Sequence, residues 1–285
     1  MFKYTVPPEC GGMSAGMFLR RYCGLTARSL TLLRYTEGGI TRRGELLRTV
    51  DTVIAGDEII LSLPEEHNDI EPVEGELSIL YEDGYLLVVD KPPFMPVHPV
   101  KVHQADTLAN IVSYYQKKLV EDYTFRALNR LDRNTSGCVI IVKDRLTYAL
   151  VQPTVSKKYT AVCEGIIESE GTVDSPIALA EGSKIKRAVS PGGLRAVTHY
   201  KPVIIGKSHT MLELRLETGR THQIRCHMSS IGHPLAGDDL YGGSLEYIDR
   251  QALHCSYVEL THPVSRERIE LLSDIPQAFY RVLKN

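Results

Sequence analysis

The sequence lacks a long apolar segment, a paired-cysteine motif and any repeated or low-complexity tract. No uncharged apolar stretch approaches the ~20 residues that a membrane helix requires, and the opening MFKYTVPPECGG has no apolar core of a signal peptide. We therefore expect a cytoplasmic protein with no membrane partner. The six cysteines are dispersed and form no C-x-x-C pair, which disfavours zinc-ribbon and thiol-redox proteins and indicates reduced thiols.

Basic residues are missing from one long stretch and concentrated on either side of it. From Thr49 to Asp90 there is no Lys or Arg, although twelve acidic residues are present. Between Met17 and Arg48 the sequence has seven arginines and only two acidic residues, both glutamates. Between Ser183 and Met228 it has nine Lys or Arg and again only two glutamates. The net charge of -2 hides this segregation. Such basic blocks suit contacts with RNA phosphates, although a charge run is more commonly a solvated face.

These charge boundaries coincide with an apparent division of the chain. Residues 1–63 contain a helical stretch followed by short strands, with Gly-Gly and Gly-Asp turns between them, and so form a small α/β module. Residues 64–76, PEEHNDIEPVEGE, are acidic and poor in apolar periodicity, which predicts a linker. Residues 77–285 then form a larger domain.

The larger domain has the pattern of an α+β fold. Asp83-Gly84 predicts a hairpin turn, and residues 107–119 have apolar side chains at helical spacing. Strand-like runs occupy 126–132, 137–143, 158–164, 195–205, 209–217, 252–260 and 267–272. Several gaps are too short for the crossovers of a doubly wound sheet. We therefore expect a mixed, mainly antiparallel central sheet flanked by helices.

One short stretch, ALNRLDRNTSGCVIIVKD, places a single carboxylate between two arginines. Asp132 lies between Arg130 and Arg133 and is followed by turn-forming residues and an apolar run. Nearby guanidinium groups favour the ionised carboxylate. Such a group suits nucleophilic attack, stabilisation of a developing cation, or a simple surface ion pair.

This stretch resembles the signature H-R-L-D-x-x-T-S-G of the RluA family of pseudouridine synthases. Three further segments resemble family motifs in the family's order: KKYTAVCEG (157–165), TGRTHQIRCHMSSIGHPLAGDDLYG (218–242) and ALHCSYVELTHP (252–263). An ordered set of four motifs is far more specific than any one of them. Residues 1–63 are similar to the alpha-L RNA-binding domain often fused in front of this enzyme, with Arg28 and Arg34 as its expected RNA contacts.

The resemblance implies an isomerase that converts uridine in RNA to pseudouridine, by breaking the glycosidic bond, rotating the base and rejoining it through carbon. No cofactor is required. The resemblance makes Asp132 the essential carboxylate, either attacking the sugar or removing a proton to give a glycal, which the sequence does not distinguish. It also implies that Tyr159 stacks on the uracil and assists the late deprotonation, and that Arg225 pairs with Asp132.

Further residues of the matched motifs are expected to contact the RNA. Arg130 is implied to enter the RNA stack as the target nucleotide flips out, with general phosphate binding as its alternative. In a regular strand, Arg130 and Asp132 would project from the same face. The remaining expected RNA contacts of the larger domain are Arg133, Thr135, Lys157, Arg220, His222 and Gln223.

Some questions stay open at this level. Asn129 replaces the family's frequent His, and its amide can also fill a hydrogen-bonding place. His222, Cys226, His227 and His233 invite a metal reading, but no H-E-x-x-H order or second cluster supports one. We therefore expect no metal. The rival functions are a metal-dependent hydrolase, which measurement of bound zinc would reveal, and a catalytically silent RNA-binding or ribosome assembly protein. We expect a monomer acting on large-subunit rRNA, with tRNA as the alternative target.

Overall fold

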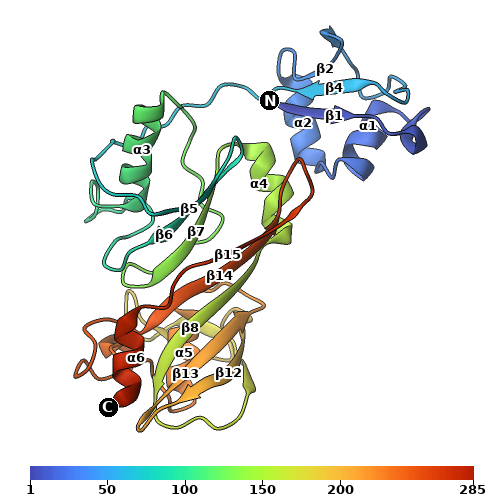
Figure 1. Cartoon of the computed structure of the whole chain (residues 1–285). Coiled ribbons are helices and arrows are strands. Elements are labelled where there is room, and N and C mark those ends of the chain that lie inside the picture. The colour runs from blue at the N-terminus through green and yellow to red at the C-terminus, as the bar shows by residue number, and fades with distance from the viewer.

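The computed structural model describes residues 1–285 and shows two bodies of unequal size joined by a long connection (Figure 1). The N-terminal module lies at one end of the molecule and the larger domain extends away from it. No helix is both long enough and apolar enough to cross a membrane.

The N-terminal module is a small sheet with helices on one face. Its four strands are β1 (Phe2–Thr5), β2 (Ile40–Arg42), β3 (Glu45–Leu46) and β4 (Glu58–Leu61), arranged in the antiparallel order β1-β4-β2-β3. The helical part comprises η1 (Pro8–Cys10), α1 (Ala15–Met17), η2 (Phe18–Tyr22) and α2 (Ala27–Tyr35). The side chain of Thr26 accepts a hydrogen bond from Ser29 N (3.0 Å) and begins α2.

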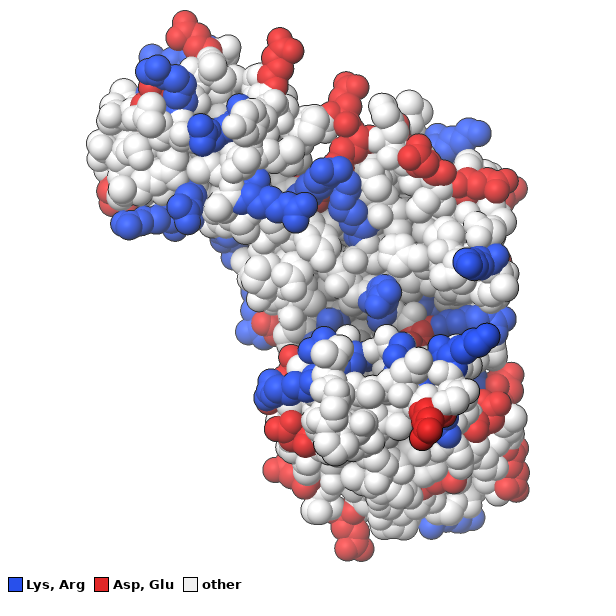
Figure 2. Space-filling view, turned by 180° about the vertical axis from the view of Figure 1, so that it is seen from behind, with Lys and Arg blue, Asp and Glu red and all other residues white.

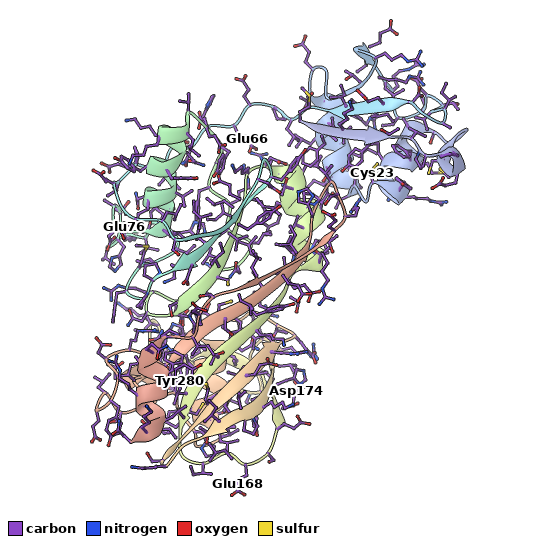
Figure 3. The ribbon with its side chains drawn as sticks, in the orientation of Figure 1. Cys23, Glu66, Glu76, Glu168, Asp174 and Tyr280 are labelled. Carbon is purple, nitrogen blue, oxygen red and sulfur yellow. The ribbon has the colours of Figure 1, made fainter.

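The connection over residues 64–76 contains no helix or strand but is fastened to the larger domain. Ser113 Oγ donates to Ile70 O (2.7 Å), Asn110 Nδ2 donates to Glu71 O (2.8 Å), and Val73 N donates to Asn110 O (3.1 Å). These partners belong to α3 (Leu108–Leu119). Figure 3 labels Glu66 and Glu76 in this segment. The acidic stretch therefore runs along the larger domain instead of crossing open solvent.

The larger domain is built on a nine-stranded sheet with the order β5-β6-β7-β14-β8-β13-β12-β9, and β15 pairs with β14. The strands are β5 (Ile79–Glu82), β6 (Leu86–Lys91), β7 (Ser136–Val142), β8 (Ser156–Glu164), β9 (Gly171–Asp174), β12 (Val197–Ile205), β13 (His209–Leu216), β14 (Leu253–Thr261) and β15 (Arg268–Leu272). A separate hairpin joins β10 (Ile177–Leu179) and β11 (Arg187–Val189). The expected mixed, mainly antiparallel sheet is confirmed.

A single parallel pair, β7 with β14, links the two halves of this sheet. It requires a close approach of the two backbones at Gly137, where φ is +109° and an added Cβ would lie 2.3 Å from Cys255 O. Only glycine tolerates this geometry without displacement of the chain. The glycine of the Thr-Ser-Gly run therefore fixes where the strand after Asp132 meets β14.

Helices cover the sheet and complete the core. The helix expected over 107–119 is α3, and it begins at a capping box between Thr107 and Asn110. Asp144 caps α4 (Arg145–Val151), while η3 (Gln152–Thr154), α5 (Gln223–Ser230), η4 (Asp239–Tyr241) and α6 (Gln277–Lys284) follow. Every residue of β7 is buried, as expected for a central strand under helices.

The strand expected over residues 126–132 is wrong. The backbone pairs with β7 only around Arg126 and Leu128, where Val142 N donates to Arg126 O (2.9 Å) and Leu128 N donates to Ile140 O (2.8 Å). The Asn129 side chain then replaces the main chain, because its amide bonds both Cys138 O and Ile140 N at 2.9 Å. The chain is released from the sheet after this point, which allows residues 130–135 to form a turn.

Candidate active site

Asp132 lies on the turn that precedes β7. It lines a large cleft in the surface of the catalytic domain. Thr135 N donates to Asp132 O (3.0 Å) and closes the turn. The carboxylate is 27% exposed, so it is accessible without being fully hydrated. The cleft has a volume of about 1030 Å³, and Asp132 and Tyr159 both line it.

The carboxylate of Asp132 is held by Arg225 of α5. Arg225 Nη1 donates to Asp132 Oδ2 (3.0 Å), whereas its Nε and Nη2 donate to Asp238 Oδ2 (2.7 Å) and Oδ1 (2.8 Å). Burial acts to lower the pKa of Arg225, but hydrogen bonds and charges from Asp238 and Asp132 outweigh it and raise that pKa. The guanidinium group is therefore permanently charged and fixed by a bidentate partner while it orients Asp132.

The two arginines that flank Asp132 in the sequence do not pair with it. Arg130 and Arg133 are exposed and line the cleft, and neither forms an ion pair with a carboxylate. The positive charge that pairs with Asp132 is therefore not that of its sequence neighbours but that of the residue which the family resemblance implied. Arg225, 93 residues later, provides it.

His222 and Tyr241 complete the surroundings of Arg225. His222 begins α5 with φ +57°, and its Nε2 lies 3.8 Å from Asp132 Oδ2. The Tyr241 hydroxyl accepts from Arg187 N (2.8 Å) and lies 3.1 Å from His222 Nδ1, while the Tyr241 ring centroid lies 5.0 Å from the Arg225 guanidinium carbon. Burial lowers the pKa of His222, which favours a neutral imidazole beside the carboxylate.

Tyr159, on β8, lines the cleft together with Asp132. Its side chain is buried, and burial, followed by the neighbouring Cys255 and Asp132, raises its pKa well above the usual value. The phenol is therefore neutral in the free protein, and its ring is a rigid aromatic surface beside Asp132. A role as a base requires that its proton be taken up by another group at the same time.

A smaller pocket of about 60 Å³ opens between these groups. Asp132, Tyr159 and Arg225 line it together with Leu216 and Leu253. Its lining thus combines apolar side chains with several converging polar and charged groups, which is typical of a small-ligand site. The arrangement can hold a flat, polar ring against Tyr159 while the carboxylate of Asp132 reacts with a group attached to it.

The rim of the cleft is basic. Arg130, Arg133 and Arg220 are exposed and Lys157 is half-buried, and none of the four has a carboxylate partner. Burial lowers the pKa of Lys157. Unpaired cations around a cleft favour a polyanionic ligand. Arg28 and Arg34 are exposed on α2 in the N-terminal module, outside the cleft.

Two of the residues expected to contact RNA are occupied within the protein. Gln223 is buried, and its amide bonds Val197 O, Thr198 Oγ1, Thr218 Oγ1 and Arg220 N. Thr135 is also buried, and its hydroxyl accepts from Gln251 Nε2 (3.3 Å). Both border the small pocket. Their polar groups therefore support the loops of the site, and their expected contact with RNA stays a prediction.

Two buried cations beneath the Asp132 turn were missed. Lys91 Nζ donates to Pro92 O (2.7 Å), Met95 O (2.8 Å) and Arg133 O (3.3 Å), and Arg250 Nη1 donates to Asn134 O (3.0 Å). Burial, with the charge of Arg250, lowers the pKa of Lys91 to about 7. Together they fasten the main chain immediately after Asp132. The contacts with the Asp132 turn join segments 42 and 116 residues apart in the chain, which no local pattern reveals.

The histidine- and cysteine-rich segment does not converge on a point. No three His, Cys, Asp or Glu side chains have an arrangement suited to a metal ion. The His227 ring bonds Thr198 Oγ1 and Ser175 O, both at 2.9 Å, and His233 Nδ1 bonds Glu164 O (2.8 Å). These imidazoles connect α5 and its following loop to the sheet.

Asp238 was also missed, although it is the most buried charge of the site, and its removal should be costly. Asp238→Ala leaves the guanidinium of Arg225 buried with only one partner, and we expect the free energy of unfolding to fall by about 3–5 kcal/mol. Asp239, which is exposed, offers a control, and Asp239→Ala should change it by less than about 1 kcal/mol. Urea unfolding measures both. Equal losses in the two variants would contradict the assigned role.

Comparison with known proteins defines the class of protein to which this fold and site belong. Residues 85–230 match the family model described as RNA pseudouridylate synthase, and the chain belongs to this family of RNA-modifying isomerases. It is thus an RNA pseudouridine synthase. The resemblance to the RluA family that the four motifs indicated is confirmed.

Three individual proteins show how similar the chain is to members of this family. The chain is 41% identical over 230 residues to the uncharacterized RNA pseudouridine synthase YhcT of Bacillus subtilis, an alignment that covers 78% of this chain and 76% of the relative. It is 35% identical over 298 residues to ribosomal large subunit pseudouridine synthase D of Pseudomonas aeruginosa, covering 98% and 93%. The solved human RNA pseudouridylate synthase domain containing 1 has 26% identity and a TM-score of 0.58, covering 74% and 86%.

Proposed function

We propose that this enzyme converts specific uridines of large-subunit ribosomal RNA to pseudouridine, with Asp132 as the essential carboxylate. The observation that carries the proposal is the array of Asp132, Arg225 and Asp238, in which one buried guanidinium joins an accessible carboxylate to an inaccessible one. This geometry keeps Asp132 oriented toward the small pocket and leaves its second oxygen free to react. The relative named for the large ribosomal subunit, aligned along nearly all of both chains, supports rRNA as the target.

The proposed reaction needs no cofactor, because bonds are exchanged within a single nucleotide. The glycosidic bond from nitrogen to the sugar breaks, the freed uracil rotates, and a ring carbon joins the same sugar carbon. Asp132 either forms a covalent bond with the sugar or removes a sugar proton to give a glycal. In both versions, Tyr159 stacks on the uracil and Arg225 positions the carboxylate.

Access to a paired uridine requires that the nucleotide leave the RNA stack. Arg130 lies on the rim above Asp132 and is exposed, so we assign it the place vacated by the nucleotide. Arg133, Lys157 and Arg220 are proposed to bind the adjoining phosphates, and His222 to lie beside the reacting sugar. The protein is proposed to act as a monomer in the cytoplasm.

We propose that residues 1–63 bind RNA, that residues 64–76 connect them to the catalytic domain, and that residues 77–285 contain the whole active site. The catalytically silent alternative is not favoured. Transfer RNA as the substrate is the second outcome of the mapping test. Pseudouridines mapped by chemical probing in a deletion strain should disappear from large-subunit rRNA; losses confined to tRNA would overturn the proposed target. Release of tritium from labelled uridine in RNA tests the activity itself.

A basic rim that binds phosphates predicts a specific salt response. Arg220→Gln removes one unpaired cation of the cleft, so the slope of log affinity against log salt should become shallower by close to one unit. Lys201, which is exposed and lies outside the cleft, provides a control: Lys201→Gln should leave the slope unchanged. Binding of an rRNA transcript at several salt concentrations measures both. An unchanged slope for Arg220→Gln would remove it from the RNA contacts.

A further inference from the structure

The N-terminal module is docked on the catalytic domain by a shared apolar core. Leu146 and Leu150 belong to α4 of the larger domain, yet they are only 2% and 7% exposed and pack in the cluster formed by Phe18, Leu19 and their neighbours in the module. Val264, in the turn between β14 and β15, packs against the same cluster. Domains of one chain usually move relative to each other unless their interface is hydrophobic and extensive. This interface continues the core of the module itself.

A hydrogen bond also joins the N-terminal module to the catalytic domain at this interface. Arg266, in the turn between β14 and β15, has φ +63°, and its Nη2 donates to Cys23 O (2.6 Å). Figure 3 places Cys23 at the face of the module that meets this hairpin. A non-glycine residue in the left-handed region is uncommon and persists where surrounding contacts hold it.

Aromatic contacts extend the junction to the hairpin of β5 and β6. The rings of Phe2 and Tyr85 lie 4.9 Å apart, and Tyr85 packs edge-on against His262 at 5.5 Å. His262 Nε2 in turn lies 2.9 Å from Asp83 Oδ2. The module therefore meets three separate segments of the catalytic domain: α4, the β5–β6 turn and the β14–β15 turn.

The connection between the bodies is also held in place near this junction. The carboxylate of Glu66 pairs with Arg126 and with Arg145, the first residue of α4. These two ion pairs and the hydrogen bonds of residues 70–73 to α3 leave few residues of the connection without a contact to the larger domain.

The module presents its unpaired charge on one part of its surface. Arg42, Arg43 and Arg48 form ion pairs with Asp57 or Asp51. The four arginines of the helical part have no such partner and are exposed; they are Arg20, Arg21, Arg28 and Arg34. Basic side chains line the lower edge of the module and gather again in a band across the catalytic domain (Figure 2).

We propose that the N-terminal module is a fixed arm, and that its docking on α4 and Arg266 determines which RNAs the enzyme accepts. The inference rests on the proposed RNA substrate. A rigid arm holds its four free arginines at a constant position relative to the cleft. It therefore favours a folded RNA whose phosphates reach both sites at once, and it disfavours one that reaches only the cleft. A flexible arm would bind RNAs of many shapes equally.

The first test measures the arm without RNA. Small-angle X-ray scattering of the full chain should fit the single arrangement described above. Arg266→Gly removes the locking guanidinium while keeping a residue suited to positive φ, and together with Leu150→Ala it should broaden the distance distribution. Arg268→Ala, in an exposed ion pair on β15, is the matched control and should not change the profile. A broad distribution for the unaltered chain would overturn the proposal whatever its activity.

The second test measures selection. With an unmodified large-subunit rRNA transcript, the Arg266→Gly, Leu150→Ala variant should bind about 10-fold more weakly, because a loosened arm lowers the effective concentration of its arginines. Its single-turnover rate at saturating RNA should stay within about twofold, and its affinity for a short stem-loop should not change. Arg266→Gly alone provides the same comparison if the double variant does not fold. If Arg268→Ala and the Arg266→Gly, Leu150→Ala variant bind the transcript with equal affinity, the proposal is overturned. If the unaltered protein has a fixed arm but does not form pseudouridine, only the proposed function is refuted.

Discussion

Replacement of Asp132 by asparagine should abolish pseudouridine formation while leaving the protein folded and able to bind RNA. The amide preserves the size of the side chain and can still accept a hydrogen bond from Arg225 Nη1, which lies 3.0 Å from the present carboxylate. It has neither the charge nor the basicity needed to attack the sugar or take its proton. We expect the single-turnover rate to fall by at least about 10³-fold, which corresponds to more than about 4 kcal/mol of transition-state stabilisation.

Single-turnover tritium release at saturating RNA measures this effect. The RNA affinity should remain within about threefold, because the cleft has other cations to bind phosphates and loses only one negative charge. Asp239→Ala, at an exposed position, is a control for general damage and should retain full activity. Activity of Asp132→Asn above a few per cent would remove Asp132 from the chemical step.

The second large effect is expected at Tyr159. Tyr159→Phe keeps the buried ring and removes only the hydroxyl, so RNA binding and flipping of the uridine should persist. If the oxygen serves in the late deprotonation of the ring carbon, the reaction should stall before product, with a rate loss of at least about 10²-fold. The high pKa that burial imposes on this phenol makes the outcome informative, because a buried neutral phenol is a weak base.

The two possible roles of Tyr159 separate by comparing variants. Unimpaired product formation by Tyr159→Phe would mean that only stacking matters. Tyr159→Leu should then be the damaging change, since it removes the aromatic surface and leaves an apolar side chain. Rapid quenching followed by nucleoside analysis distinguishes an accumulated intermediate from unreacted uridine. Equal activity of the unaltered enzyme and both variants would mean that Tyr159 takes no part in the reaction.

The features that could be predicted from the sequence are those encoded locally. The helix over 107–119 and six strands from 137 onward are evident from apolar spacing, whereas the short strands β9, β10 and β11 were not predicted. Asp132 stood out because its surrounding motif is nearly complete. The strand over 126–132 failed because Asn129 substitutes its amide for backbone pairing, a replacement that hydrophobic alternation does not reveal.

Contacts made across long sequence separations could not be predicted in the same way. The pairing of Asp132 with Arg225 was expected only from the family motifs, because local charge pointed to the flanking arginines, which form no ion pair with it. Asp238 accepts hydrogen bonds from the guanidinium of Arg225, and Lys91 and Arg250 donate to the carbonyl groups of Arg133 and Asn134; only the folded chain brings these groups together. The packing of the N-terminal module on Leu146 and Leu150 could not be predicted either. The sequence of a helix does not show whether a leucine packs against its own domain or against another one.

The parallel pairing of β7 with β14 has a consequence for the order in which the enzyme becomes competent during synthesis. The turn that carries Asp132 is held on one side by Arg250, and at the start of β7 Ser136 Oγ lies 2.9 Å from the His254 ring, 118 residues further along the chain. Closing so long a loop is among the slower events of folding. A nascent chain that ends before residue 250 thus contains Asp132 and the contact of Lys91 with its turn, but it lacks the contacts that Arg250 and His254 provide. We therefore expect the Asp132 turn to reach its final conformation only after residues 250 to 254 have been synthesised.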